Sequence, residues 1–155
     1  MKAFLSYSLN DRDQFILTLL AKELSLKGFS INQSNDFNTQ MSQLTKVNIS
    51  KSNLFIGLIS GKGIEKVRVQ NEWSLANNSN IPSILIIENT VTVSQDFHYP
   101  YIVFDRHNPH FAVGQLNNII SEMKKETNND SNAWAWILGG AALLSIFNLL
   151  GKDEK

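Results

Sequence analysis

Short apolar runs alternate, over the first 121 residues, with longer segments in which hydrophobic positions recur every three or four residues. The runs predict strands, and the segments between them predict helices, because residues three and four apart share one face of a helix. The central run is almost wholly apolar, which is typical of a strand covered on both faces. The predicted strands are residues 2–7, 29–33, 54–59, 84–87 and 101–104.

Four segments carry the helical spacing. The first begins at the capping pattern from Ser8 to Asp11 and ends before Gly28, and the third covers about residues 66–78. The last begins near Pro109. In chain order, the predicted buried positions are Phe15, Leu19, Leu20 and Leu24, then Met41, Leu44 and Val47, then Val69, Trp73 and Ala76, then Phe111, Leu116, Ile119, Ile120 and Met123.

The alternation predicts the fold class. Strands that alternate with helices are typical of an α/β domain, here a flavodoxin-like parallel sheet of about five strands flanked by helices. Ligands bind such sheets outside the carboxyl ends of the strands. We therefore expect the functional site among the loops at residues 7–11, 33–37, 60–63 and 88–91.

A second apolar segment, residues 133–150, lies apart from this domain and holds no charged side chain. As a helix it would extend about 27 Å, close to the roughly 30 Å hydrocarbon core of a bilayer. Trp134 and Trp136 at its start and Lys152 and Lys155 beyond its end suit membrane interfaces. We expect a transmembrane helix that contacts lipid. The alternative is an amphipathic helix that packs on the domain or on a partner.

The chain thus divides into a domain at 1–121, a polar tether at 122–132, the membrane helix at 133–150 and a tail at 151–155. The tether is expected because its residues are too polar to pack. The first residues do not form a signal peptide, so we expect a single-pass tail anchor with the domain in the cytoplasm. The small residues at 139–142 either bring two such helices together or are simply tolerated there.

Composition excludes several kinds of chemistry. The 155 residues include no cysteine, so disulfides and cysteine-ligated metals are ruled out. Fourteen basic residues balance fourteen acidic ones, which argues against a nucleic-acid partner. His98, His107 and His110 lack metal-ligand spacing, and no phosphate-binding glycine motif occurs. We expect neither a metal nor a resident cofactor.

The remaining candidate for catalysis is Glu72 on the predicted third helix. It lies one helical turn after Arg68 and directly before Trp73. One interpretation is a surface ion pair between Glu72 and Arg68. The other is a functional carboxylate.

Four motifs in consistent order bear on that choice, because they resemble those of TIR (Toll/interleukin-1 receptor) domains over roughly residues 2–121. Residues 2–11 are similar to the family's opening box, with a strand that ends in Ser-Tyr-Ser before an acidic residue. Residues 58–60 resemble the end of its third strand, and 81–84 resemble the start of its fourth. Residues 69–76 resemble its next helix, where a glutamate precedes an alanine by four positions.

The resemblance implies a TIR-like fold and an activity. Many bacterial TIR domains cleave the nicotinamide–ribose bond of NAD, which implies that Glu72 is the catalytic glutamate and that NAD is a substrate. Positive charge grows on the ribose as this bond breaks, and a nearby carboxylate stabilises it. The implied substrate-binding residues are Ser6, Tyr7, Ser8, Asp36, Ser60 and Trp73.

Two of these assignments have alternatives. Trp73 would either stack on a ring of the substrate or pack in the core. Asp36, or Asn35 beside it, would either contact the ribose or cap the second helix.

Three departures from the family's pattern mean that the resemblance is to the divergent bacterial branch of the family. The loop at 33–38 lacks a Pro-Gly pair, the late Phe-Trp box is absent, and Arg68 stands where a tryptophan is often found. We therefore expect a membrane-anchored enzyme that consumes NAD, either as a glycohydrolase or as a synthase of cyclic or conjugated ADP-ribose. It would act in bacterial antiphage defence through self-association of its TIR domains.

Two alternatives stay open. The first is a non-enzymatic TIR assembly module that recruits an effector protein to the membrane. The second is transfer of a nucleobase between deoxyriboses by a related α/β fold that also places a carboxylate at the sugar.

Overall fold

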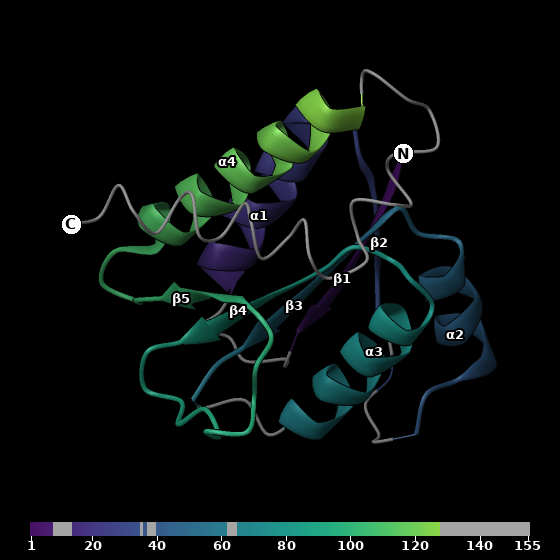
Figure 1. Cartoon of the computed structure of the whole chain (residues 1–155), viewed down its shortest axis with the longest axis horizontal. Helices are drawn as coiled ribbons and strands as arrows, with labels where there is room; N and C mark the ends of the chain where they lie inside the picture. Colours follow the sequence, from purple (N-terminus) through teal and green to yellow (C-terminus); the bar gives the residue numbers. More distant parts are fainter. Residues whose placement is uncertain (8–13, 35, 37–39, 62–64, 128–155) are drawn as a thin grey trace.

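Figure 1 shows a computed structural model of the chain, which describes residues 1–7, 14–34, 36, 40–61 and 65–127. The strands in these ranges are all parallel and form one sheet in the order β2-β1-β3-β4-β5. The predicted α/β fold with a flavodoxin-like sheet flanked by helices is therefore confirmed for this part of the chain. Its elements are β1 (Lys2–Tyr7), α1 (Gln14–Leu26), β2 (Ser30–Gln33), α2 (Gln43–Ser50), β3 (Leu54–Ile59), α3 (Lys66–Asn78), β4 (Ser83–Glu88), β5 (Tyr101–Phe104) and α4 (Pro109–Thr127).

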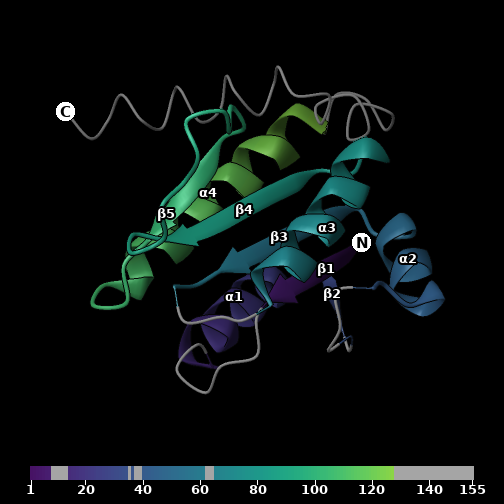
Figure 2. The same cartoon turned by 90° about the horizontal axis from the view of Figure 1, so that it is seen from below.

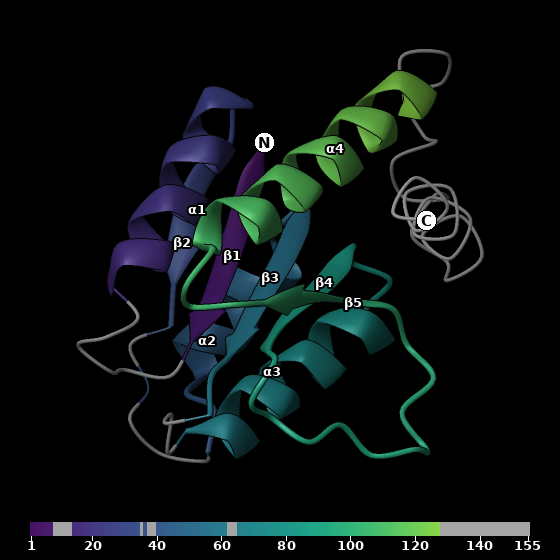
Figure 3. The ribbon, with the colours of Figure 1, turned by 90° about the vertical axis from the view of Figure 1, so that its left-hand side faces the viewer.

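Helices cover both faces of the sheet. α1 and α4 lie on one face, and α2 and α3 lie on the other, as Figures 2 and 3 show from two directions. Alternate residues of β1 point to opposite faces, so Leu5 joins the core under α1 and α4 while Phe4 joins the core under α2 and α3. Phe4 stacks there on Phe55 of β3, with ring centroids 5.8 Å apart.

The close packing of α3 on β3 depends on Gly57. A Cβ atom there would lie 2.8 Å from Leu85 Cδ2 and 3.3 Å from Val69 Cγ1 of α3. A side chain at this position would push the end of Leu85 aside and press on Val69, so glycine leaves room for the close packing of α3 on the middle of the sheet. Val69 and Ala76 are fully buried in this contact and set the rotation of α3.

Three of the predicted helical stripes are partly wrong. Phe15, Leu44 and Phe111 are exposed by 59%, 65% and 50%. In α1 the buried stripe is Ile16, Leu20 and Leu24. α2 is short and mostly polar, and the packing of Ile49 against Phe4 and Phe55 turns Leu44 outward. Tertiary contacts therefore decide the inward face where the amphipathic pattern is short or ambiguous.

The carboxyl-terminal boundary of the domain also differs from the prediction. α4 extends to Thr127 and Met123 is fully buried, so the first part of the predicted tether belongs to the last helix of the domain. No helix among the residues described is long and apolar enough to cross a membrane. The predicted membrane segment 133–150 lies outside the described residues, as do residues 128–132, the tail and the capping pattern from Ser8 to Asp11.

Candidate functional site

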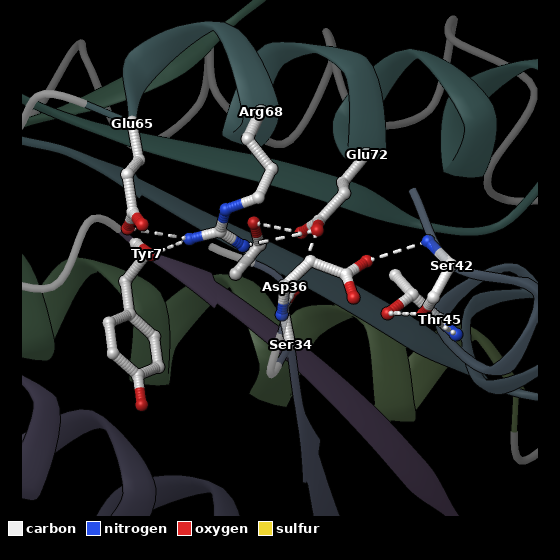
Figure 4. A network of polar contacts seen from close by, with 9 residues as sticks. Tyr7, Ser34, Asp36, Ser42, Thr45, Glu65, Arg68 and Glu72 are labelled. Atoms are coloured by element: carbon white, nitrogen blue, oxygen red, sulfur yellow. Dashed lines mark hydrogen bonds and ion pairs between the residues drawn. The ribbon is translucent and has the colours of Figure 1, made fainter. Parts of the chain in front are cut away.

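The carboxylate of Glu72 lies where polar side chains from three elements meet, at the carboxyl ends of β1 and β2 (Figure 4). Glu72 is fully buried. The Ser6 hydroxyl of β1 donates to Glu72 Oε2, and the Ser34 hydroxyl, which follows β2, donates to Oε1 over 2.7 Å. Strand order reverses beside β1, which is where open α/β sheets bind ligands.

Arg68 supplies the counter-charge for Glu72. Its Nη1 donates to Glu72 Oε1 over 3.1 Å, and its Nη2 donates to Glu65 Oε2 over 3.0 Å and to the Tyr7 carbonyl oxygen. The predicted pair between Arg68 and Glu72 therefore exists, but its side chains are only 2% and 0% exposed, so it is not a surface pair. Arginine suits this position because its planar fork can reach several acceptors at once.

The hydrogen bonds leave Glu72 with spare accepting capacity. A carboxylate offers about four lone-pair positions. Within the described residues, Oε1 accepts from Ser34 and Arg68, whereas Oε2 accepts from Ser6 alone. Oε2 therefore keeps unused lone-pair capacity, and because Glu72 is fully buried a further hydroxyl group reaches it only if the side chains that cover it move.

Asp36 fixes the start of α2 beside this network. Its Oδ2 accepts from the Ser42 N–H over 2.9 Å, and Ser42 is the N-cap of α2. The capping role proposed for Asp36 or Asn35 therefore belongs to Ser42, and Asn35 lies outside the described residues. Partial burial opposes ionisation of Asp36, but hydrogen bonds from the Ser42 N–H and from the Thr45 and Ser42 hydroxyls, with the charge of Arg68, hold its pKa below its usual value.

The structure does not bring all of the predicted substrate-binding side chains to Glu72. Tyr7 meets the network through its carbonyl oxygen, while its phenol points away and donates to Gln33 Oε1 over 3.1 Å (Figure 4). Ser60 is buried directly after β3. Trp73 contacts Phe97 on a different flank of α3, because adjacent helical residues point about 100° apart. Ser8 lies outside the described residues.

Two partners of Glu72 were missed or misread from the sequence. Ser34 was not proposed, although Leu5 pairs with Gln33 in the sheet, so the next residues, Ser6 and Ser34, lie level with each other. This signal requires the strand order, which the sequence pattern alone does not supply. Arg68 was recognised as a partner, but its burial was not.

A second buried carboxylate, Glu88, connects the ends of three strands. Arg106 donates to both of its oxygens, over 3.1 and 3.0 Å, and the Gly61 N–H donates over 3.0 Å. Burial opposes ionisation of Glu88, but the hydrogen bonds from Arg106, Gly61 and Thr90 and the charge of Arg106 lower its pKa. With its acceptors used in this way, Glu88 connects loops and is a structural group.

Comparisons with known proteins find a similar fold but no matching family. No family model and no curated protein matches the chain. A solved structure, the CMP N-glycosidase BcmB of Clostridium botulinum, matches with a TM-score of 0.55 and 16% sequence identity. The match covers 76% of this chain and 99% of that one. At this identity the likeness is one of fold, and it spans nearly the whole of BcmB.

The site is therefore a buried, oriented carboxylate on a fold that BcmB shares. Within the described residues, no cluster of three or more histidine, aspartate or glutamate side chains could hold a metal ion. The described groups supply a negatively charged carboxylate with unused lone pairs at Oε2, which can act on a reacting centre once the side chains that cover it move.

Proposed function

We propose that the chain is an N-glycosidase that hydrolyses the bond between the ribose and the base of a nucleotide, with NAD as substrate and Glu72 as the catalytic residue. The observation that carries the proposal is the buried Glu72 carboxylate, held by Ser6, Ser34 and Arg68 at the edge where sheets of this kind bind ligands. The name of the structural neighbour, a CMP N-glycosidase, supports the reaction class.

In the proposed reaction the bond between ribose C1′ and the base nitrogen breaks, and its electron pair leaves with the base. Water then forms the new bond to C1′ and releases one proton. Positive charge on the sugar is largest in the transition state. Once substrate binding moves the side chains that cover Glu72 and its Oε2 binds a ribose hydroxyl, the carboxylate therefore interacts most strongly there. Arg68 pairs with both Glu72 and Glu65, so the cluster has a net negative charge. That charge stabilises the positive charge on the sugar.

The chemistry of the leaving group supports NAD as the proposed substrate. Nicotinamide leaves NAD as a neutral molecule, whereas a base such as cytosine leaves more readily when an acid protonates it. The lowered pKa of Asp36 keeps that group ionised near neutral pH, so it is unsuited to supply the proton. Within the described residues around Glu72, the other side chains bonded to it are the serine hydroxyls and Arg68, which are poor acids at that pH.

The direct experiment compares the two substrates. The full chain, in phospholipid nanodiscs and in vesicles at increasing density, is incubated with NAD and separately with CMP, and free nicotinamide and cytosine are measured. We expect nicotinamide release that depends on Glu72. Cytosine release without nicotinamide release would keep the reaction class and overturn NAD as the substrate, and release of neither would overturn the enzymatic proposal.

The vesicle format follows from the rest of the proposal. We propose that residues 133–150 anchor the chain as a single-pass membrane helix, that the domain faces the cytoplasm as a divergent TIR domain in antiphage defence, and that self-association raises its activity. The four motifs and the apolar segment support this. If no nucleotide is turned over while Glu72→Gln keeps both fold and partner binding, the non-enzymatic assembly module is the better account.

A further inference from the structure

A second candidate binding site lies on α3, on a different flank from Glu72. It is a pocket of about 300 Å³ between α3, the ends of β3 and β4, and the segment that connects β4 to β5, which runs beside α3 in Figure 3. Positions 66, 70 and 73 line it, whereas positions 68 and 72 face the polar network. We call it the α3 pocket.

The walls of the α3 pocket are mostly apolar and are braced by aromatic contacts. Ile87 and Val93 line it together with Trp73 and Phe97. The rings of Trp73 and Phe97 lie 5.6 Å apart, and Tyr99 packs edge-on against Trp73 at 4.9 Å. Tightly packed rings have little freedom to collapse inward, so the pocket is preformed, and its volume is at the lower end of the range for small-molecule sites.

Lys66 is the only charged residue that lines the α3 pocket in the described part of the chain. It is half-buried, and no carboxylate described in the structure pairs with it. The nearby Glu65 instead pairs with Arg68, on the side of the network. A lysine in the lining of an apolar pocket favours a ligand whose apolar part fills the pocket and whose anionic group reaches the lysine.

We propose that the α3 pocket binds a small planar apolar molecule with a single negative charge, such as an aromatic monocarboxylate. Its ring system lies against Trp73, Val93 and Phe97, and its carboxylate binds Lys66. Gln70, Thr92 and Ser94 are the other polar residues of the lining and can donate further hydrogen bonds. The site is distinct from the Glu72 network and does not depend on the proposed reaction.

The test uses the three tryptophans of the full chain as reporters in nanodiscs. With ¹⁵N-labelled tryptophan, the indole signal of Trp73 reports on the pocket. Those of Trp134 and Trp136, in the proposed membrane helix, serve as the comparison for ligand that partitions into the nanodisc. Trp73→Phe identifies the pocket signal. The probes are 2-naphthoate and 2-naphthol, which have similar shapes but differ in charge at neutral pH because a phenol titrates near 10.

We expect both probes to shift the Trp73 signal saturably, with 2-naphthoate about fivefold tighter because of its charged contact with Lys66. Lys66→Gln should remove the difference and leave 2-naphthol binding unchanged. Lys46→Gln, at an exposed position of α2, makes the same charge change elsewhere and should preserve the difference. Val93→Trp, which fills the pocket, should abolish binding of both probes.

Three results would overturn the proposal. The first is a Trp73 signal that moves no more than those of Trp134 and Trp136. The second is equal affinity for the two probes in the unmodified chain. The third is an equal effect of Lys46→Gln and Lys66→Gln, which would mean that net charge and not the pocket attracts the anion. The dispersion of the remaining amide signals shows whether each variant is folded.

Discussion

Replacement of Arg68 by methionine removes the counter-charge of Glu72 and keeps an apolar stem of similar length. Removal of one partner from a buried ion pair costs about 3–5 kcal/mol, because the remaining charge is left without compensation. Glu72 keeps the hydrogen bonds from Ser6 and Ser34, so we expect the lower end, about 3 kcal/mol. The free energy of unfolding from urea titration at pH 7 measures this loss.

A double-mutant cycle separates loss of the pair from loss of packing. Glu72→Gln keeps the hydrogen-bonding shape of the side chain and leaves Arg68 paired with Glu65, so alone it should cost about 1 kcal/mol. In Arg68→Met/Glu72→Gln no uncompensated carboxylate remains at position 72, so the double variant should be more stable than the sum of the single costs predicts, by about 1–3 kcal/mol. Additive costs, or an Arg68→Met variant within about 0.5 kcal/mol of the unmodified protein, would refute the reasoning.

Three further variants test the surroundings of the site. Ser34→Ala should lower kcat for nicotinamide release about tenfold, because Oε1 loses one of its two orienting donors, and steady-state kinetics measures it. Gly57→Ala should destabilise the domain by about 1 kcal/mol in thermal or urea unfolding, because its Cβ would displace the end of the Leu85 side chain and press on Val69. Glu88→Gln should destabilise at neutral pH; because the folded pKa of Glu88 is below its ordinary 4.5, the deficit should persist above about that pH and shrink as the pH falls through the folded value. A deficit independent of pH would contradict the assignment for Glu88.

The fold was predictable because the strands carry strong local signals. β3 is apolar throughout. The apolar runs of β1 and β4 predict strands, whichever residue is taken as the end of each strand. The inward faces of α1 and α2 were harder, because Phe15 and Leu44 fit a helical stripe as well as the residues that are actually buried. Their orientation follows from packing between distant parts of the chain.

Residues of the candidate site were predictable where a local pattern, a motif or the spacing of one helical turn, contains them. Glu72 and Ser6 lie within motifs that resemble those of the TIR family, and the structure joins them by a hydrogen bond. Ser34 depends on β2 lying beside β1, which is a property of the whole sheet. Trp73 had two interpretations, stacking on a substrate ring or packing in the core, and its packing against the hydrophobic core on the α3 side of the sheet agrees with the second.

The most direct test of the central claim is the rate of nicotinamide release from NAD by the full chain in vesicles, compared between the unmodified protein and Glu72→Gln. Glu65→Gln is the matched control, because it removes a carboxylate from the same Arg68 guanidinium without a change at position 72. We predict that Glu72→Gln lowers kcat at least about 100-fold, ~2.7 kcal/mol of transition-state stabilisation, while Glu65→Gln changes it less than about tenfold. Equal rates for folded Glu72→Gln and the unmodified protein would contradict the account.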